Sequence, residues 1–288
     1  MTGFADAEAA YEKAGAVILP VPYDLSLSYR PGARLGPQAI LAASVEVELF
    51  DDELGLTPAE VGLHTAAPVP WVAGDAGASH DLIQEAADEH LSAGKWVLAL
   101  GGDHSITYPL VLAHREHHRE FSVLQIDAHT DLYPEWQGSE RSHATPMYRL
   151  HRAGLKVVGV GQRAIAAEDR ELIGREGIKV FPMHAIREQA GWMDQVIAAL
   201  GPRVYVTFDF DALDPSIMPA TGTPLPGGFD WWTATRLLDK VFAAREVVGM
   251  DLVELSPVPG HFPAEMLAAQ LAYRALGLRL RALRSRGH

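Results

Sequence analysis

Seven short apolar runs, most of them rich in β-branched residues, alternate along this 288-residue chain with stretches of helical pattern. The apolar runs are predicted to be strands, at residues 16–21, 96–100, 122–126, 156–160, 179–181, 203–208 and 247–252. The stretches between them are predicted to be helices, at residues 38–43, 79–93, 106–115, 166–176, 190–200, 232–244 and 263–284. Strands that alternate with helices form a mostly parallel sheet covered on both faces. We therefore predict an α/β fold with three α/β/α layers.

The rest of the sequence limits the class of protein. No repeat or linker divides residues 1–288, so a single domain is expected after an acidic, Ala-rich lead-in at residues 1–12. No apolar stretch approaches the roughly 18 residues that span a bilayer, and no leader is evident, which favours the cytoplasm. The net charge of −13 disfavours nucleic acid as a partner. It is compatible with ordinary solubility or with attraction of a cationic substrate.

Three segments rich in His and Asp follow or close predicted strands. They are Gly-Gly-Asp-His-Ser at 101–105, Asp-Ala-His-Thr-Asp at 127–131 and Asp-Phe-Asp-Ala-Leu-Asp-Pro at 209–215. In open parallel sheets, ligands bind beyond the carboxyl ends of the strands. We therefore expect the three segments to meet at one edge of the sheet. Ser105 is the expected N-cap of the third helix.

The side chains in these segments are typical metal ligands. Asp127, His129 and Asp131 alternate, so in an extended segment they point the same way, and Asp209 and Asp211 repeat the pattern. Two buried carboxylates so close together repel each other unless a cation lies between them. Taken singly, each segment could instead be a polar turn or an exposed strand end, and His104 a hydrogen-bonded core histidine. Together the segments favour metal binding.

The ligand chemistry indicates which metal and which reaction. The chain has no cysteine, so only oxygen and nitrogen ligands are available. That set suits Mn²⁺ better than Zn²⁺, which usually takes more His or Cys. Two such ions about 3.5–4 Å apart activate water, which predicts a hydrolase.

The three segments, in this order, resemble those of the ureohydrolases, the family of arginases and agmatinases. The resemblance runs from Pro20 to about Gln270 and includes Arg-Pro-Gly-Ala-Arg-Leu-Gly-Pro at 30–37, Pro-Ala-Thr-Gly-Thr-Pro at 219–224 and Asp-Leu-Val-Glu-Leu-Ser-Pro at 251–257. It implies an arginase-like fold that binds two Mn²⁺ ions. The ligands that the resemblance implies for the first ion are His104, Asp127, Asp131 and Asp209. Those for the second are Asp127, His129, Asp209 and Asp211.

The resemblance also implies roles in releasing urea and an amine from a guanidino group. Glu254 matches the carboxylate that orients the guanidinium, and Asp131 would relay a proton to the leaving amine. His143 matches a proton-shuttling histidine near the mouth of the site, although Ala144 follows it where the family more often has Gly. Without the resemblance, Glu254 would be interpreted as one partner of a salt bridge at a strand end, and His143 as a histidine in a surface loop.

Three features resemble agmatinases more than arginases: the loop at 30–34, the Thr-Gly-Thr-Pro run followed by two glycines, and residues 132–137. The last lacks the small polar run with which arginases hold the α-amino and α-carboxylate groups. The predicted substrate is a small cationic guanidine, agmatine or aminopropylagmatine, which would yield putrescine or spermidine. Tyr133 and Trp136 are candidates to pack on it, and Glu135 or Glu140 to pair with its distal amine. Ordinary loop packing is the alternative.

Other functions stay open at this point. A guanidino-acid or formiminoglutamate hydrolase would need a cationic group in the cavity, and Arg141, Arg149 and Arg163 are candidates. An arginase is a further alternative within the same family. A deacetylase-like amidohydrolase would use one zinc ion with fewer ligands, and a metal-binding scaffold would have no turnover. The resemblance further implies a homo-oligomer, a trimer or hexamer. The Arg-rich residues 279–284 would serve such an interface or, equally, a solvated helix end.

Overall fold

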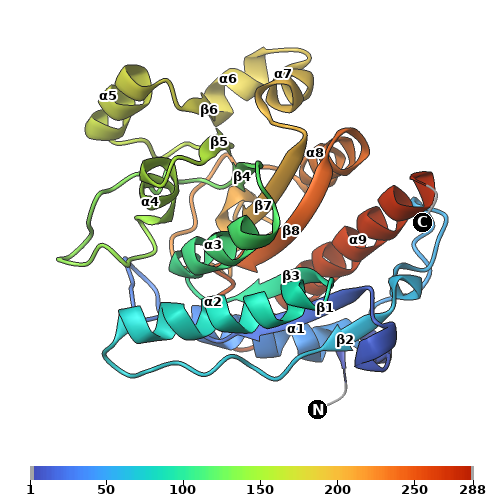
Figure 1. Ribbon diagram of the computed structural model, residues 1–288. Helices are drawn as coiled ribbons and strands as arrows, with labels where there is room; N and C mark the ends of the chain where they lie inside the picture. The colour runs from blue at the N-terminus through green and yellow to red at the C-terminus, as the bar shows by residue number, and fades with distance from the viewer. Residues whose placement is uncertain (1–2, 287–288) are drawn as a thin grey trace.

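The computed structural model describes residues 3–286, and one parallel sheet runs through it (Figure 1). The strands are β1 Ala16–Val21, β2 Leu63–Thr65, β3 Trp96–Gly101, β4 Ser122–Ile126, β5 Lys156–Val160, β6 Lys179–Phe181, β7 Arg203–Asp209 and β8 Glu246–Val253. Their order across the sheet is β2-β1-β3-β8-β7-β4-β5-β6, and every pair is parallel. All seven predicted strands are confirmed, with ends within one residue. The prediction missed β2, which is only three residues long.

Helices cover both faces of the sheet, which confirms the predicted three layers (Figure 1). Their bounds are α1 Gly36–Ser44, α2 Ala76–Ser92, α3 Thr107–His117, α4 Pro146–Arg152, α5 Ala167–Glu176, α6 Met183–Glu188, α7 Trp192–Ala199, α8 Trp231–Ala244 and α9 Pro263–Ser285. One core lies between the sheet and α1 with α6 to α9, and the other between the sheet and α2 to α5. The sequence did not predict the short helices α4 and α6.

The strands are apolar because both of their faces are buried. In β3, Leu98 and Leu100 belong to the core under α1 and α9, whereas Val97 and Ala99 belong to the core under α2 and α3. This alternation follows from the two-residue period of a strand. Each large side chain buried in this way stabilises the fold by about 1.5–3 kcal/mol.

The topology explains why the His/Asp segments meet. The strands β3, β8, β7 and β4 are neighbours at the centre of the sheet, although they lie far apart in the sequence. His104 follows β3, Asp127 follows β4, Asp209 closes β7 and Glu254 follows β8. Because the strands are parallel, their carboxyl ends all lie at the same edge. The sheet order therefore gathers these four side chains beside one another.

The first described residues, which were predicted to be only a lead-in, pack against the rest of the fold. Phe4 is fully buried and packs on Tyr273 of α9, with the ring centroids 6.4 Å apart. The Glu8 carboxylate accepts hydrogen bonds from the Thr65 backbone N–H in β2. Residues 3–12 thus close one end of the fold, while residues 1 and 2 lie outside the described part.

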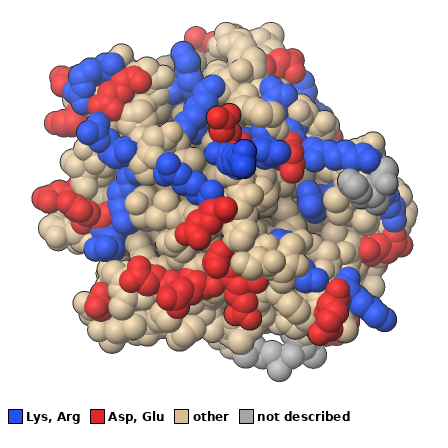
Figure 2. Space-filling view, in the orientation of Figure 1, with Lys and Arg blue, Asp and Glu red and all other residues tan. Residues whose placement is uncertain are grey.

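Charge is unevenly distributed over the surface. Figure 2 shows acidic side chains gathered over the lower part of this face, where α2 lies, and basic side chains mainly over the upper part. Exposed acids of α2 include Asp81, Glu85 and Glu89. Within residues 3–286, no helix is long and apolar enough to cross a membrane.

The buried His114 should make the fold sensitive to acid. Burial lowers the pKa of its imidazole to about 4 from an ordinary value of 6.5. The unfolded chain therefore binds a proton between pH 6.5 and 4 that the folded chain does not, so stability falls as pH falls through that range. We expect His114→Gln to flatten the slope of the unfolding free energy there by about 1.4 kcal/mol per pH unit. Denaturant titrations at several pH values measure this slope, and an unchanged slope would contradict the expectation.

Candidate metal centre

His104 reaches the site through a tight turn at the end of β3. Gly102 lies against the Tyr23 backbone, where a Cβ atom would come within 1.7 Å of the Tyr23 carbonyl oxygen, so only glycine fits there. The Asp103 carboxylate then accepts a hydrogen bond from the Ser105 N–H at 3.0 Å and caps the short helix His104–Ile106. The predicted cap at Ser105 is therefore wrong: Asp103 is the capping residue, and α3 continues directly from this turn.

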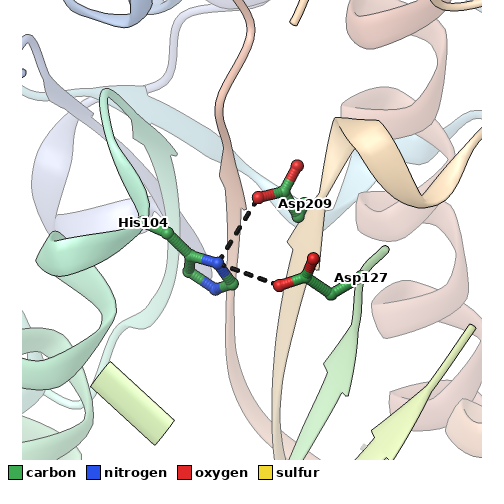
Figure 3. Close-up of side chains that lie close together, drawn as sticks. All are labelled: His104, Asp127 and Asp209. Atoms are coloured by element: carbon green, nitrogen blue, oxygen red, sulfur yellow. Dashed lines mark ion pairs between the residues drawn. The ribbon is translucent and has the colours of Figure 1, made fainter. Parts of the chain in front are cut away.

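The imidazole of His104 points at carboxylates from two other strands (Figure 3). Its Nδ1 atom lies 3.1 Å from Asp127 Oδ2, 2.8 Å from Asp131 Oδ2 and 3.4 Å from Asp209 Oδ2. Its other nitrogen, Nε2, lies 2.8 Å from the Thr207 hydroxyl oxygen. Nδ1 is buried and has no hydrogen-bond partner among the described residues. A buried, unpartnered nitrogen beside three carboxylate oxygens fits a metal ligand.

His129 forms a second cluster beside the first. Its Nδ1 atom lies 2.9 Å from Asp211 Oδ2 and 3.6 Å from Asp127 Oδ1. Asp127 therefore takes part in both clusters, one oxygen facing each histidine. The structure thus brings together all six side chains predicted as metal ligands. Two His and four carboxylates, without sulfur, suit a pair of hard or borderline divalent ions.

Backbone N–H groups fix the carboxylates in place. Asp127 Oδ1 accepts from His129 N–H at 2.6 Å, Asp209 Oδ1 from Asp211 N–H at 2.8 Å, and Asp211 Oδ1 from Ala128 N–H at 3.1 Å. Each bond leaves the second oxygen of the carboxylate directed toward the cluster. The alternating Asp-x-His and Asp-x-Asp patterns therefore have a structural role. The backbone N–H of the residue two positions after each Asp donates to the Asp carboxylate and orients it.

The site concentrates negative charge in a buried place. Burial and the neighbouring Asp127 raise the pKa of Asp131 to about 6, and burial with Asp211 and Asp127 raises the pKa of Asp209. Burial lowers the pKa of His129, but the Asp211 and Asp127 carboxylates raise it to about 12. These shifts all show an excess of negative charge that divalent cations would balance. The donor set, the orphaned His104 Nδ1 and the electrostatics therefore fit two metal ions.

Glu254 lies directly beside this centre. Its Oε1 atom accepts a hydrogen bond from the His104 backbone N–H at 2.8 Å, and burial raises the pKa of its carboxyl well above the ordinary value. Its backbone has a φ of 67°, and that of Asp131 is 50°, a left-handed conformation that non-glycine residues rarely adopt. Such strain concentrates at functional sites. Both residues were predicted as functional.

His143 lies in a loop and lines the same cavity as Glu254, and both its ring nitrogens have hydroxyl partners. Nε2 is 2.7 Å from Ser28 Oγ, and Nδ1 is 3.1 Å from Ser26 Oγ. Burial, followed by the nearby imidazoles of the metal centre, lowers the pKa of His143 to about 4. The imidazole is therefore neutral near pH 7.

A cavity of about 490 Å³ opens onto the centre. Tyr133 and Trp136, the two candidates to pack on the substrate, line it, with their ring centroids 4.9 Å apart. Glu135 and Glu140 are exposed and do not line it. Besides the carboxylates of the candidate metal centre and Glu254, Asp169 of α5 lines the cavity; it is buried and accepts a hydrogen bond from Thr130. Sequence reasoning missed Asp169, although its place in the first turn of a helix after β5 was a usable signal.

The three arginines considered for an acidic substrate lie elsewhere. The Arg163 guanidinium donates hydrogen bonds to backbone carbonyl oxygens, including those of Asp211 at 2.6 Å and Leu225 at 2.8 Å. Arg149 stacks on the ring of Tyr108, 3.5 Å from its centroid, and Arg141 is exposed. Among residues 3–286, no Lys or Arg lines the cavity.

Thr207 should support the metal centre from behind. Its hydroxyl oxygen faces His104 Nε2, which fixes the proton on that nitrogen and leaves Nδ1 free for a metal. We expect Thr207→Val to weaken metal affinity about 10- to 100-fold, since partners of metal-binding histidines typically contribute that much. Competition with a chelator measures the affinity. Thr235→Val, which removes a buried hydroxyl in α8, should leave it unchanged; an equal loss in both variants would contradict the role of Thr207.

The site and fold match known proteins. The family model of the arginase family matches residues 14–277. An N(1)-aminopropylagmatine ureohydrolase from Thermus thermophilus is 58% identical, and the match covers 96% of this chain and 94% of that protein. A protein of the same name from Synechocystis is 37% identical over 95% of this chain and 92% of its own length. The crystal structure of an agmatine ureohydrolase from Thermoplasma volcanium has a TM-score of 0.88 and 27% identity, covering 99% of this chain and 96% of that one.

The chain therefore belongs to the arginase family, as its sequence motifs predicted. Enzymes of this family depend on a binuclear metal centre, and the two adjoining His/Asp clusters are where such a centre fits. The chain is a hydrolase that cleaves a small guanidino compound to urea and an amine. This excludes the deacetylase-like and non-catalytic alternatives.

Proposed function

We propose that the substrate is N(1)-aminopropylagmatine, which the enzyme hydrolyses to urea and spermidine. The observation that carries this proposal is the cavity wall away from the metal centre, where a buried carboxylate, Asp169, and two aromatic rings lie and where none of the described lining residues is Lys or Arg. Such a wall suits a chain that bears more than one positive charge and disfavours a guanidino acid. The name of the 58%-identical relative supports the same substrate.

We propose that His104, Asp127, Asp131 and Asp209 hold one ion and that Asp127, His129, Asp209 and Asp211 hold the other. Mn²⁺ is the ion we propose, because the ligands are carboxylates and imidazoles only. When bound, such a pair supplies Lewis-acid stabilisation and lowers the pKa of water at the site.

The chain's own residues then position the substrate and move protons. The Glu254 carboxylate, held by the His104 N–H, pairs with the planar guanidinium through charge-assisted hydrogen bonds. Asp131 lies within the centre and delivers a proton to the leaving amine. His143, neutral near pH 7, exchanges protons between the cavity and solvent. Tyr133 and Trp136 pack along the alkyl chain and exclude water from it.

Asp169 is expected to recognise an amine of the substrate beyond the guanidino group. Asp169→Asn removes the charge and keeps the size of the side chain. It should raise KM about 10- to 30-fold with a smaller change in kcat, because the lost hydrogen bond to a charged group contributes about 1.5–2 kcal/mol to binding. Steady-state kinetics measure both constants. Glu171→Gln, an exposed change in the same helix, serves as the control. A KM unchanged by Asp169→Asn would show that this carboxylate does not bind substrate.

The substrate proposal is tested by measuring urea release, with Mn²⁺-loaded protein, from aminopropylagmatine, agmatine, arginine and 4-guanidinobutyrate in parallel. We expect the highest kcat/KM for aminopropylagmatine, a lower value for agmatine, and little turnover of the two acids. A higher kcat/KM for agmatine would make it the substrate and would keep the mechanism. Preferred turnover of arginine or guanidinobutyrate would contradict the conclusion that the cavity wall favours a polycationic substrate over a guanidino acid.

We further propose that residues 1–288 act as one ureohydrolase domain and assemble into a trimer or hexamer. The predicted contribution of residues 279–284 is weakened by pairing within the chain: Arg281 contacts Asp239, and Arg284 contacts Glu60. Exposed apolar side chains such as Tyr29, Phe50 and Phe262 are better candidates for the interface. Light scattering that shows only a 31.3 kDa species would refute the assembly.

A further inference from the structure

We propose that Asp103 and Ser26 are positioning residues that hold His143 in one tautomer, with its proton on Nδ1 and the lone pair of Nε2 directed toward the opening of the site. Asp103 stands beside a metal ligand but is absent from both ligand clusters. The inference deepens the proton-shuttle role proposed above for His143 and rests on it.

The contacts form a continuous chain from the cavity into the protein interior. Ser26 Oγ lies 2.8 Å from the His143 backbone nitrogen and 3.1 Å from His143 Nδ1. Both the backbone N–H and the hydroxyl of Ser26 lie 3.1 Å from Asp103 Oδ2. Asp103 is only 1% exposed. The segment 24–28 is thus held at the mouth of the site by a buried carboxylate.

The available hydrogens determine which group donates. The His143 backbone N–H can only donate, so it occupies one lone pair of Ser26 Oγ. Asp103 is already an acceptor for the Ser26 N–H, and the single hydroxyl hydrogen of Ser26 is directed to the same carboxylate oxygen. The second lone pair of Ser26 Oγ is then left for His143 Nδ1, which must carry a hydrogen to use it. Ser142 Oγ is a longer contact of the same nitrogen, at 3.3 Å.

The other end of Asp103 is fixed as firmly. Its Oδ1 atom accepts from the Ser105 N–H at 3.0 Å and from the Ser105 hydroxyl at 2.5 Å. Ser105 Oγ in turn lies 3.3 Å from Nε2 of the buried His80. With both oxygens held, the carboxylate cannot turn away from Ser26. The turn that presents His104 to the metal centre therefore also fixes the loop that carries Ser26.

The tautomer matters because it decides which nitrogen can accept a proton. With hydrogen on Nδ1, the lone pair lies on Nε2, which faces Ser28 Oγ at 2.7 Å, and Ser28 lines the cavity. The Ser28 hydroxyl donates to that lone pair, so a proton from the cavity side can pass to Nε2 through Ser28 and return to solvent by the same route while Nδ1 keeps its own. The loop sequence fits this use: the hydroxyls of Ser26 and Ser28 both face the His143 ring, whereas Leu25, Leu27 and Tyr29 between and beside them are exposed.

The tautomer can be read directly from the ¹⁵N chemical shifts of the His143 ring, without substrate, in protein loaded with diamagnetic Cd²⁺. His143→Gln identifies the signals by their loss. We expect a protonated-type shift for Nδ1 and an unprotonated-type shift for Nε2 in the unmodified protein. A proton on Nε2 instead would overturn the proposal at once, whether or not any variant folds.

Three variants then test which serine sets the tautomer. Ser26→Ala should populate the other tautomer and lower kcat of the Mn²⁺ enzyme about 10- to 100-fold, within the usual contribution of general acid–base groups. Ser26→Thr keeps the hydroxyl and should restore both the tautomer and most of kcat. Ser28→Ala removes the partner of Nε2 and should leave the proton on Nδ1. An unchanged tautomer in Ser26→Ala, or equal losses in the Ala and Thr variants, would overturn the proposal.

These outcomes are separable from failure of the proposed function. If the unmodified enzyme released no urea from any of the four guanidino compounds, the substrate assignment would fall. The ring shifts of the unmodified protein and of the Ser26 and Ser28 variants would still decide which tautomer is present and whether Ser26 fixes it.

Discussion

Asp127→Asn is expected to abolish urea release and to lower the number of bound metal ions below two per chain. Asp127 is shared between the clusters around His104 and His129, with one carboxylate oxygen facing each histidine. An amide keeps the size of the side chain but removes the charge that two cations need. Without the metal pair, water at the site loses its lowered pKa, so kcat should fall by at least about 10³-fold.

Bound metal is measured by elemental analysis of the dialysed protein, alongside kcat. Asp81→Asn is the matched control, because Asp81 is exposed on α2 and lies outside both clusters. It should keep the metal content and the activity of the unmodified enzyme. An Asp127→Asn enzyme that retained two ions and full turnover would show that the metal centre lies elsewhere.

Glu254→Gln is expected to lower kcat/KM about 30- to 5,000-fold while leaving the metal content unchanged. Glutamine can still accept the hydrogen bond from the His104 N–H, so the local geometry should survive. What is lost is the charge opposite the guanidinium, and removal of one partner from a buried charge pair costs about 2–5 kcal/mol. Folding should not suffer, since burial raises the pKa of this carboxyl and an uncharged amide relieves that cost.

The same substitution at Glu120, which is exposed after α3, provides the control for Glu254→Gln. Kinetics with the Mn²⁺ enzyme should show no change for that variant. If Glu254→Gln kept its kcat/KM, or if it lost activity only by losing metal, Glu254 would be a structural neighbour of the centre and not the group that binds the guanidinium.

The sequence predicted the sheet, and the grouping of the His and Asp side chains at one of its edges, because strong local signals specify both. Strands buried on both faces are nearly all apolar, so β4 and β5 could be predicted with their observed ends. The six residues proposed as ligands follow such strands, and at Asp127 and Asp209 the spacing places a backbone N–H where it orients the carboxylate. The resemblance to ureohydrolases then assigned the roles that spacing alone leaves open.

Other features could not be predicted because they depend on contacts between distant segments. The strand β2 has only three residues, and its pairing with β1 defines it. Asp169 belongs to the cavity only because α5 packs beside the loop that follows β4. The link from Asp103 through Ser26 to His143 joins three separate segments. Arg163 was a candidate to bind an acidic substrate, but its guanidinium donates hydrogen bonds to backbone carbonyl oxygens of two other segments, at Asp211 and Leu225.

Two metal ions, held by the six proposed ligands, are expected to make the chain active as a guanidino hydrolase. The most direct test is to titrate metal-free protein with Mn²⁺ and to follow bound metal and urea release from aminopropylagmatine in the same samples. We expect activity to rise steeply with the second equivalent and to reach its plateau at two ions per chain. Full activity with one ion per chain, or with none, would contradict it.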